Sequence, residues 1–240
     1  MPGSGTEDLI SRIESLDLAF TGLWSESVRL ECGTFFSNPD MPNDIFFDKL
    51  AGIKCLDDKM IGEALGLFEK YHTVPYFYLH AREDLEKVLA GKGFRLYDVQ
   101  RVLAAKPSHH ATAALRVGAG GAMRWAETFC SAYDCMGWIG AVSKVVQGTS
   151  DKIEYYLDEQ CTSCVALYEK GQVLGLYCLG TVPRARRRGQ ASLLVDFAAG
   201  EAGRRGLDLL VLETYERDGL GDFYARLGFG EVYRKKIYTI

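Results

Sequence analysis

The sequence lacks the features that mark membrane, secreted and nucleic-acid-binding proteins. No apolar run approaches the ~18 residues of a membrane-spanning helix. The N-terminal stretch MPGSGTEDLISRIE has neither the charged segment nor the apolar segment of a secretion signal. The formal net charge is −4, so overall charge would not draw the chain to nucleic acid or to anionic lipid. We therefore expect a cytoplasmic protein with no membrane partner and no nucleic-acid partner.

The cysteines predict neither a disulfide framework nor a metal site. There are seven of them, an odd number, in a chain without an export signal, so we expect reduced thiols. Cys161 and Cys164 form a CxxC pair that could join Cys130 and Cys135 as four ligands. The latter two, however, are five residues apart on an expected helix and would not share a face. We expect no bound metal.

A chain of 240 residues is long enough for one large domain or two small ones. A stretch rich in Gly, Ala and Ser, within residues 105–122, is typical of a connection between two halves. We therefore predict an N-terminal domain over residues 1–108 and a C-terminal domain over residues 119–240. Further expected elements include a strand at 27–36, a helical region at 123–147 and strands at 164–168 and 173–181.

The segment from Val173 to Leu212 has the pattern strand, tight loop, helix, strand. This pattern predicts a βαβ crossover, which places two strands in parallel and directs the helix N-terminus toward their carboxyl ends. Such a helix start presents free N–H groups and a partial positive charge, which suit a phosphate or pyrophosphate. Gly189 and Ala191 leave room for a ligand, and the arginines of the stretch 184–188 add positive charge.

Two motifs carry a resemblance to a known family. Arg186-x-x-Gly189-x-Ala191 resembles the coenzyme A signature of the GNAT acetyltransferase superfamily. Further on, Tyr224 precedes Leu227-Gly228-Phe229, as a tyrosine precedes Leu-Gly-Phe in that family. The resemblance covers about the C-terminal half of the chain. It implies an α/β (α+β) fold with a GNAT-like mixed β-sheet flanked by helices, and acetyl-CoA or coenzyme A as co-substrate.

The resemblance also implies roles for single residues. Tyr224 stands where the family usually has the general acid that protonates the departing thiolate. The strand before the loop would pair with the pantetheine arm, and backbone N–H groups from Arg187 to Ser192 would hold the pyrophosphate. The implied coenzyme A-binding residues are Leu179, Thr181, Val182, Arg186, Arg187, Arg188, Gly189, Gln190, Ala191 and Ser192.

The sequence also departs from the family pattern. Arg217 stands where many relatives have an asparagine, which puts one contact to the pantetheine arm in doubt. The general base is not evident: Glu213 is the candidate carboxylate, and Tyr177 or a chain of waters is equally open. Each assignment has a plainer alternative, since Tyr224 could be a core aromatic and the arginines a solvated loop. Cys178 would allow an acyl-cysteine route, although direct transfer is the family's usual chemistry.

The first half echoes the second faintly, in the order strand, short helix, Gly-Phe, strand around residues 74–103. It could be a degenerate GNAT-like copy or another α+β domain. It has no coenzyme A signature, so we expect it to bind none and to shape the acceptor pocket. Core packing is the alternative for the aromatic residues that could line this pocket, namely Phe46, Phe47, Trp125, Phe129 and Trp138.

Together these features predict an acyl-CoA-dependent N-acyltransferase that moves an acetyl group directly to an amine on a small molecule or peptide. A non-catalytic acyl-CoA-binding sensor or interaction module is the alternative. Longer acyl or aminoacyl donors and a homodimer also remain open.

Overall fold

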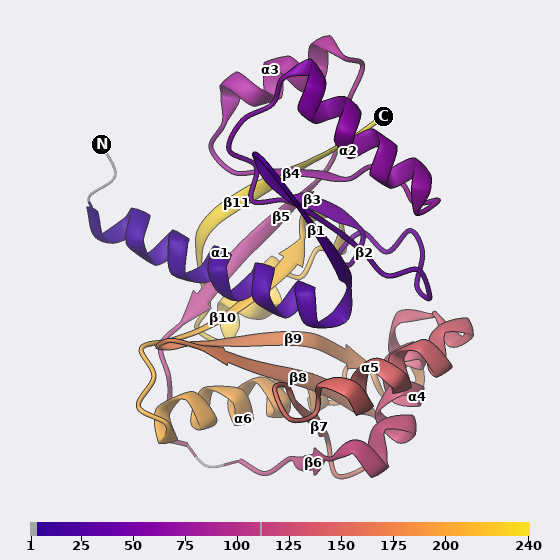
Figure 1. Cartoon of the computed structure of the whole chain (residues 1–240). Helices are drawn as coiled ribbons and strands as arrows, with labels where there is room; N and C mark the ends of the chain where they lie inside the picture. The colour runs from indigo at the N-terminus through magenta and orange to yellow at the C-terminus, as the bar shows by residue number, and fades with distance from the viewer. Residues whose placement is uncertain (1–3, 111) are drawn as a thin grey trace. The chain divides into compact units, whose positions relative to one another are not determined.

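The computed structural model describes residues 4–110 and 112–240, which form two compact units (Figure 1). The first unit holds the chain up to Val102 together with Thr214–Leu220 and Glu231–Ile240. The second unit holds Leu103–Glu213 and Gly221–Gly230. The units interleave along the sequence, whereas the predicted domains 1–108 and 119–240 are contiguous. That division into domains stays a prediction.

The first unit is a mixed sheet with helices. Its strand order is β1-β2-β3-β4-β11-β5, with β3 and β4 parallel and the pairs β1–β2, β2–β3 and β4–β11 antiparallel. The expected single strand at 27–36 is wrong, because a turn at residues 31–32 splits it into a hairpin. The elements are α1 (Ser4–Trp24), β1 (Glu26–Leu30), β2 (Gly33–Ser37), β3 (Lys49–Ala51), α2 (Asp58–Lys70), β4 (Phe77–Leu79), α3 (Glu83–Gly91), β5 (Arg95–Ala105), which continues into the second unit, η4 (Glu216–Asp218) and β11 (Gly230–Thr239).

Alternation along the strands gives the first unit two apolar faces, since successive side chains point to opposite sides of a sheet. Phe35, Leu50 and Phe77 pack in one cluster with the buried residues of α2 and α3. Their neighbours Phe36, Ala51 and Tyr78 pack in another cluster, bordered by Leu18 of α1. Each face of this sheet is therefore covered by helix.

One cysteine prediction is wrong. Cys32 and Cys55 are joined as a disulfide with their Cα atoms 5.3 Å apart, within the usual range for such a bond. It links the turn between β1 and β2 to the loop before α2. Spacing could not reveal this pair, because the two loops meet only once the strands have paired. The other five cysteines are free thiols.

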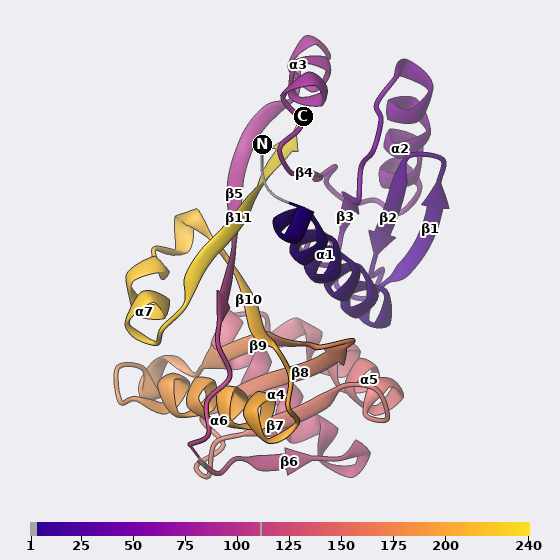
Figure 2. The same cartoon turned by 90° about the vertical axis from the view of Figure 1, so that its left-hand side faces the viewer.

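The second unit also has a mixed sheet, in the order β10-β9-β8-β7-β6. In Figure 2, α6 lies in front of this sheet and α4 behind it. Tyr156 accordingly packs on Phe197 of α6, while its neighbour Tyr155 packs on Trp125 of α4. The elements are β6 (Leu115–Val117), η1 (Ala119–Gly121), α4 (Ala122–Tyr133), η2 (Met136–Trp138), α5 (Ile139–Thr149), β7 (Glu154–Leu157), β8 (Ser163–Lys170), β9 (Val173–Thr181), η3 (Pro183–Ala185), α6 (Gln190–Arg204), β10 (Leu209–Tyr215), which continues into the first unit, and α7 (Gly221–Arg226).

The stretch expected as a loose connection, residues 105–122, is part of the second unit's structure. Residues 115–117 form β6, which pairs antiparallel with β7. Ser108 donates its backbone N–H to the carbonyl of Ala199 on α6, at 2.9 Å. The composition suggested a linker because small residues are typical of flexible chains. Small residues also pack closely against a helix, as they do here.

The same order of connections occurs twice. In the first unit, β1-β2-β3 is followed by α2, the parallel strand β4 and the short helix α3. In the second, β7-β8-β9 is followed by α6, the parallel strand β10 and the short helix α7. This repetition supports the prediction that the first half is a degenerate copy, which stays a prediction.

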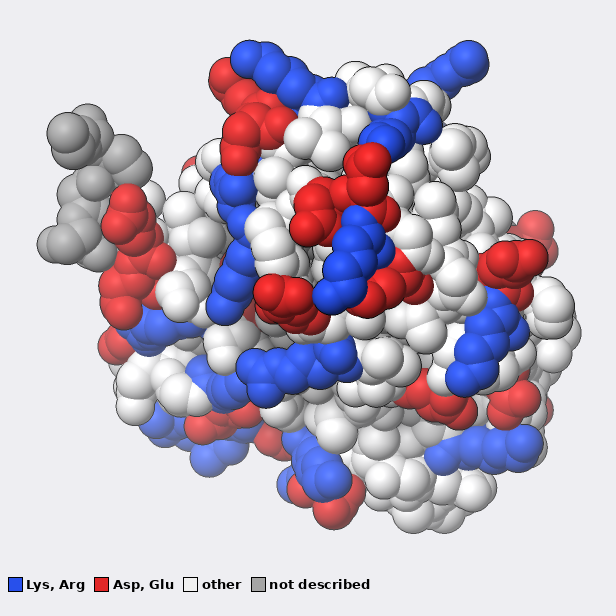
Figure 3. All heavy atoms as spheres, turned by 45° about the horizontal axis from the view of Figure 1, so that its top comes forward, with Lys and Arg blue, Asp and Glu red and all other residues white. Residues whose placement is uncertain are grey.

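Surface charge is mixed on the face shown in Figure 3, where lysine and arginine alternate with aspartate and glutamate without a large area of one sign. Within the described residues, none of the helices is both long and apolar enough to cross a membrane.

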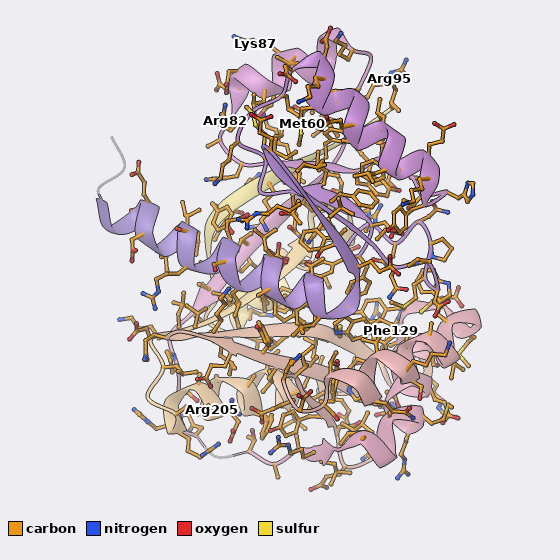
Figure 4. The ribbon with its side chains drawn as sticks, viewed as in Figure 1. Met60, Arg82, Lys87, Arg95, Phe129 and Arg205 are labelled. Atoms are coloured by element: carbon orange, nitrogen blue, oxygen red, sulfur yellow. A yellow bond between two sulfur atoms is a disulfide. The ribbon has the colours of Figure 1, made fainter. Side chains whose placement is uncertain are left out.

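Arg205, labelled in Figure 4 at the end of α6, should stabilise the second unit. Its guanidinium lies 2.7 Å from Glu154, 3.2 Å from Glu169 and 2.9 Å from Glu201, and its side chain is only 15% exposed. Arg205→Ala leaves three carboxylates without this partner, so we expect a loss of about 2 kcal/mol in unfolding free energy. Hydrogen exchange of α6 peptides measures it. The control is Arg204→Ala, because the Arg204 side chain is 67% exposed and pairs with Glu201. An equal loss in both variants would contradict the assignment.

Candidate functional site

Strand β9 leaves its parallel neighbour part-way along its length. The register with β10 runs from the pair Val173–Leu209 to the pair Leu176–Leu212. β9 then continues to Thr181, still paired with β8 on its other side. A strand that extends beyond its neighbour can offer backbone groups to an extended ligand, much as it would to an added strand.

A β-bulge lies where the two strands separate. Cys164 of β8 pairs with Gly180, and Ala166 pairs with Tyr177, so β9 has an extra residue between these pairs. Cys178 lies in the bulge with a left-handed backbone, φ 54°. Its carbonyl accepts a hydrogen bond from the Cys164 thiol at 3.4 Å. Bulges re-direct a strand and are common beside active sites.

The loop after β9 leads into an open helix N-terminus. Gly189 precedes α6 with φ 87°, a conformation that strains any other residue, and Arg187 also has positive φ, 62°. No side chain caps α6, and its first turn contains no acidic residue. The surrounding loop is exposed. The N–H groups and partial positive charge of this 15-residue helix therefore face solvent, which is the arrangement that binds phosphates.

Arg186 has a structural role in this loop. Its Nε donates to the carbonyl of Thr181 at 3.1 Å, and its Nη2 donates to the carbonyl of Ala132 at 2.8 Å. The side chain thus ties the end of β9 to the end of α4. We infer that Arg186 holds the loop in shape, while Arg184, Arg187 and Arg188 are exposed and can meet an anion.

Tyr133 is a neighbour of the site that the sequence did not reveal. Its hydroxyl, at the end of α4, donates to the carbonyl of Leu179 at 2.9 Å. The contact is close: a Cβ added at Gly180 would lie 2.7 Å from the Cβ of Ala132 and 2.9 Å from the Tyr133 ring. Gly180 is therefore required where α4 meets β9. No sequence signal marks this contact, because it joins residues 46 positions apart.

The other residues implied as coenzyme A ligands surround the same loop. The Thr181 hydroxyl lies 2.8 Å from that of Ser163, and Val182 is buried with its N–H donated to Thr162 at 2.9 Å. Gln190, Ala191 and Ser192 form the partly exposed first turn of α6. The structure thus gathers the predicted binding residues around one loop, although their role as ligands is untested.

Tyr224 lies on α7 and is 5% exposed. Its ring contacts Phe223 and Phe229 at centroid distances of 5.0 and 5.9 Å. It belongs to the same apolar cluster as Leu176 and Leu212, and Leu179 borders this cluster. The predicted acid is therefore brought to the region where β9 and β10 separate.

The two candidates for the base also lie on these strands. The pairing between β9 and β10 ends at Leu176 and Leu212. Glu213, the next residue of β10, is partly buried, and Tyr177, the next residue of β9, is buried.

Arg217 belongs to the first unit. Its guanidinium lies 3.1 Å from Asp98, donates to the Tyr97 hydroxyl at 2.9 Å and stacks near the rings of Tyr97 and Tyr215. The residue that replaces the family's asparagine is thus held by partners in its own unit.

The corresponding helix start in the first unit differs in charge. The Asp57 carboxylate caps α2 by accepting the N–H of Met60 at 2.7 Å, and Asp58 adds a second negative charge in the first turn. An anionic ligand would be repelled there. This observation supports the prediction that the first half binds no coenzyme A.

The aromatic residues proposed to line an acceptor pocket are mostly core residues. Trp125 is fully buried, with its indole N–H shared between the carbonyls of Tyr156 and Val165 at 3.2 and 3.3 Å. Phe47 is buried and stacks on Trp24 at 4.8 Å. Phe129, labelled on α4 in Figure 4, is buried. For these three residues the core-packing alternative is confirmed.

Comparison with known proteins agrees with this geometry. The model of the acetyltransferase (GNAT) family matches residues 124–229, which include the bulge, the loop, α6 and Tyr224. Residues 124–229 form a GNAT-family domain. No curated protein sequence matches the chain.

Several solved GNAT structures share the fold. A GCN5-related N-acetyltransferase from Kribbella flavida is 18% identical with a TM-score of 0.69, covering 100% of this chain and 96% of its own. One from Sphaerobacter thermophilus is 15% identical with a TM-score of 0.60, covering 96% and 90%. A tandem GNAT protein from the clavulanic acid biosynthesis pathway is 11% identical with a TM-score of 0.57, covering 89% and 81%. At these identities the likeness shows the fold alone.

The predicted fold class is therefore confirmed, as a mixed α/β sheet flanked by helices of the GNAT kind. Among the described residues, no group of three or more His, Cys, Asp or Glu side chains is placed to hold a metal ion.

Proposed function

We propose that the chain transfers an acetyl group from acetyl-coenzyme A to an amine on a small molecule or peptide, in the cytoplasm. One observation carries the proposal: the uncapped start of α6 follows directly on a strand that has left its parallel neighbour. The first feature suits a pyrophosphate and the second suits an extended, amide-bearing arm. Coenzyme A joins both groups in one molecule, and the GNAT-family match covers both features.

The residues divide the work as follows. The N–H groups at the start of α6 hold the pyrophosphate, and Arg187 and Arg188 add positive charge from the exposed loop. Backbone groups of β9 beyond Leu176 orient the pantetheine arm and polarise the thioester carbonyl. Tyr224 acts as the general acid and gives its hydroxyl proton to the departing thiolate.

The acceptor's own basicity decides how much help it needs. A lysine-like amine with pKa ~10.4 costs about 4.6 kcal/mol to deprotonate at pH 7, whereas an α-amine costs about 1 kcal/mol. Glu213 is a partly buried carboxylate and a candidate base. If Glu213 is not the base, an amine of low pKa is the acceptor that direct transfer favours.

The direct test is thiol release from acetyl-coenzyme A in the presence of a panel of amines that spans this pKa range. Release that depends on one class of amine supports the proposal. Tight coenzyme A binding with no release for any amine would instead indicate the non-catalytic sensor. Release only with longer acyl or aminoacyl donors would mean that the acyl donor is not acetyl-coenzyme A, while the assignment of the site would stand.

The loop conformation gives a prediction for binding. Gly189→Ala forces a side chain into a left-handed backbone, at a cost of roughly 1–2 kcal/mol, and displaces the N–H groups at the start of α6. We expect coenzyme A affinity, measured by titration calorimetry, to fall about tenfold. In the control, Gly148→Ala on α5, an added Cβ meets nothing within 4 Å, so affinity should not change. An unchanged affinity in Gly189→Ala would show that this loop is not part of the coenzyme A-binding site.

A further inference from the structure

Two thiols meet at the end of α4, against the expectation that they would not share a face. The helix ends at Tyr133, and Asp134 turns the backbone left-handed, with φ 57°. The N–H of Cys135 then bonds back to the carbonyl of Cys130 at 2.9 Å. In this type of helix ending, the residue after the left-handed turn commonly contacts the residue five positions before it, here Cys135 and Cys130. The Cys130 and Cys135 side chains are accordingly placed next to each other.

We propose that Cys130 and Cys135 are an oxidation site, at which a peroxide converts the two thiols to a reversible disulfide. Cys135 is partly exposed and can meet a dissolved oxidant, whereas Cys130 is fully buried beneath it. One thiol is thus placed to react first and the other to resolve the product.

The chemistry balances with a peroxide as the oxidant. The Cys135 sulfur attacks one peroxide oxygen: an S–O bond forms, the O–O bond breaks, and the leaving hydroxide takes the thiol proton as water. The Cys130 sulfur then attacks the sulfenic acid on Cys135: the S–S bond forms, the S–O bond breaks, and the hydroxyl leaves with the Cys130 proton as a second water. The thiols lose two electrons and the peroxide gains them.

The surroundings favour Cys135 as the first to react. The hydrogen bond with Cys135, followed by burial, raises the pKa of the Cys130 thiol, so Cys130 stays protonated. A third thiol, Cys164, interacts with both and is fully buried, and burial raises its pKa as well. Its bond to the Cys178 carbonyl directs it toward the bulge.

The position of the pair links oxidation to the candidate site. The same turn holds Tyr133, which donates to Leu179, and the Ala132 carbonyl, which accepts from Arg186. Formation of an S–S bond of about 2.05 Å between two separate thiols pulls the turn together. Gly180 leaves little space there, so the movement reaches β9 and the loop. We expect coenzyme A affinity to fall about fivefold or more; this part rests on the proposed function, whereas the disulfide does not.

Peptide mapping tests the disulfide in the full-length protein. After hydrogen peroxide and alkylation of free thiols, trypsin releases Trp125–Lys144, which contains both cysteines and no internal Lys or Arg. We expect this peptide unalkylated and lighter by two hydrogens, with the thiols restored by dithiothreitol. Oxidation of Met136 adds an oxygen and is distinguished by mass. Two alkylated cysteines, or a cross-link to the Ile153–Lys170 peptide that carries Cys161 and Cys164, would overturn the proposal.

Two matched variants and a binding assay complete the test. Cys135→Ser should abolish the two-hydrogen loss, and Cys161→Ser should preserve it. Calorimetry with coenzyme A is carried out before and after peroxide treatment. We expect the affinity of the wild type to fall after treatment and that of Cys135→Ser to stay the same. Equal affinity in the two states would overturn the link to the site. Absence of binding by the reduced wild type would refute the proposed function and leave the peptide result standing.

Discussion

Replacing Tyr224 by phenylalanine is expected to lower turnover about 10²–10⁴-fold, which is the usual contribution of a positioned general acid. At ~1.4 kcal/mol for each factor of ten, this corresponds to about 3–5 kcal/mol of lost transition-state stabilisation. The substitution removes only the hydroxyl. The ring keeps its contacts with Phe223 and Phe229, so the buried cluster around it should stay intact.

The measurement is kcat for thiol release, with coenzyme A affinity determined in parallel. We expect affinity to change little, because binding depends on the loop before α6 and on β9. Tyr177→Phe is the comparison variant, because Tyr177 is a candidate base and this change also removes one phenol hydroxyl beside the separation of β9 and β10. A larger loss in Tyr177→Phe than in Tyr224→Phe would make Tyr177 the acid in place of Tyr224. Unchanged turnover in both would mean that no tyrosine here acts as the acid.

The parts of the fold around the candidate site that the sequence predicted correctly are those encoded by neighbouring residues. The crossover from β9 through α6 to β10 is a continuous segment, Val173–Tyr215, and its apolar strands, its glycine and its helix are each local signals. The Lys170-Gly171 turn, which joins the antiparallel strands β8 and β9, is likewise a local signal. Local propensity and tertiary packing agree in this segment, so sequence and structure give the same answer.

The parts that the sequence missed depend on residues far apart or on a single backbone angle. The Tyr133–Leu179 contact and the Cys32–Cys55 disulfide join segments that meet only after folding. The Cys130–Cys135 contact depends on Asp134 alone, because a helix continued through it would have placed the thiols on different faces. The final strand joins the first unit, which no local pattern along residues 231–240 could indicate.

Replacing Asp17 by asparagine is expected to destabilise the first unit by about 3–5 kcal/mol. Asp17 lies on α1 and is 1% exposed, between two buried lysines. Its carboxylate is 2.9 Å from the Nζ of Lys235 and 3.4 Å from the Nζ of Lys49. Lys235 keeps a second partner in Glu14 at 3.0 Å, whereas Lys49 would retain the ring faces of Phe46 and Tyr78. The variant thus leaves a buried ammonium without its carboxylate.

The effect should depend on pH in a defined direction. Burial alone would raise the pKa of Asp17, but Lys235 and Lys49 outweigh it and lower the pKa from 3.8 to about 2. A carboxyl with a depressed folded pKa stabilises the fold above its unfolded pKa, and this contribution is lost as the pH falls toward the folded value. The difference between wild type and Asp17→Asn should therefore be constant from pH 7 to about 5 and shrink below about pH 4.

Hydrogen exchange of α1 peptides measures this loss within the first unit, because two compact units need not unfold in one transition. Asp8→Asn is the matched control: Asp8 is on the same helix and exposed, so its change should stay within about 0.5 kcal/mol. The double variant Asp17→Asn/Lys49→Met removes the stranded charge as well and should recover part of the loss. If the double variant loses as much unfolding free energy as the two single variants Asp17→Asn and Lys49→Met together, the two residues do not act as a pair.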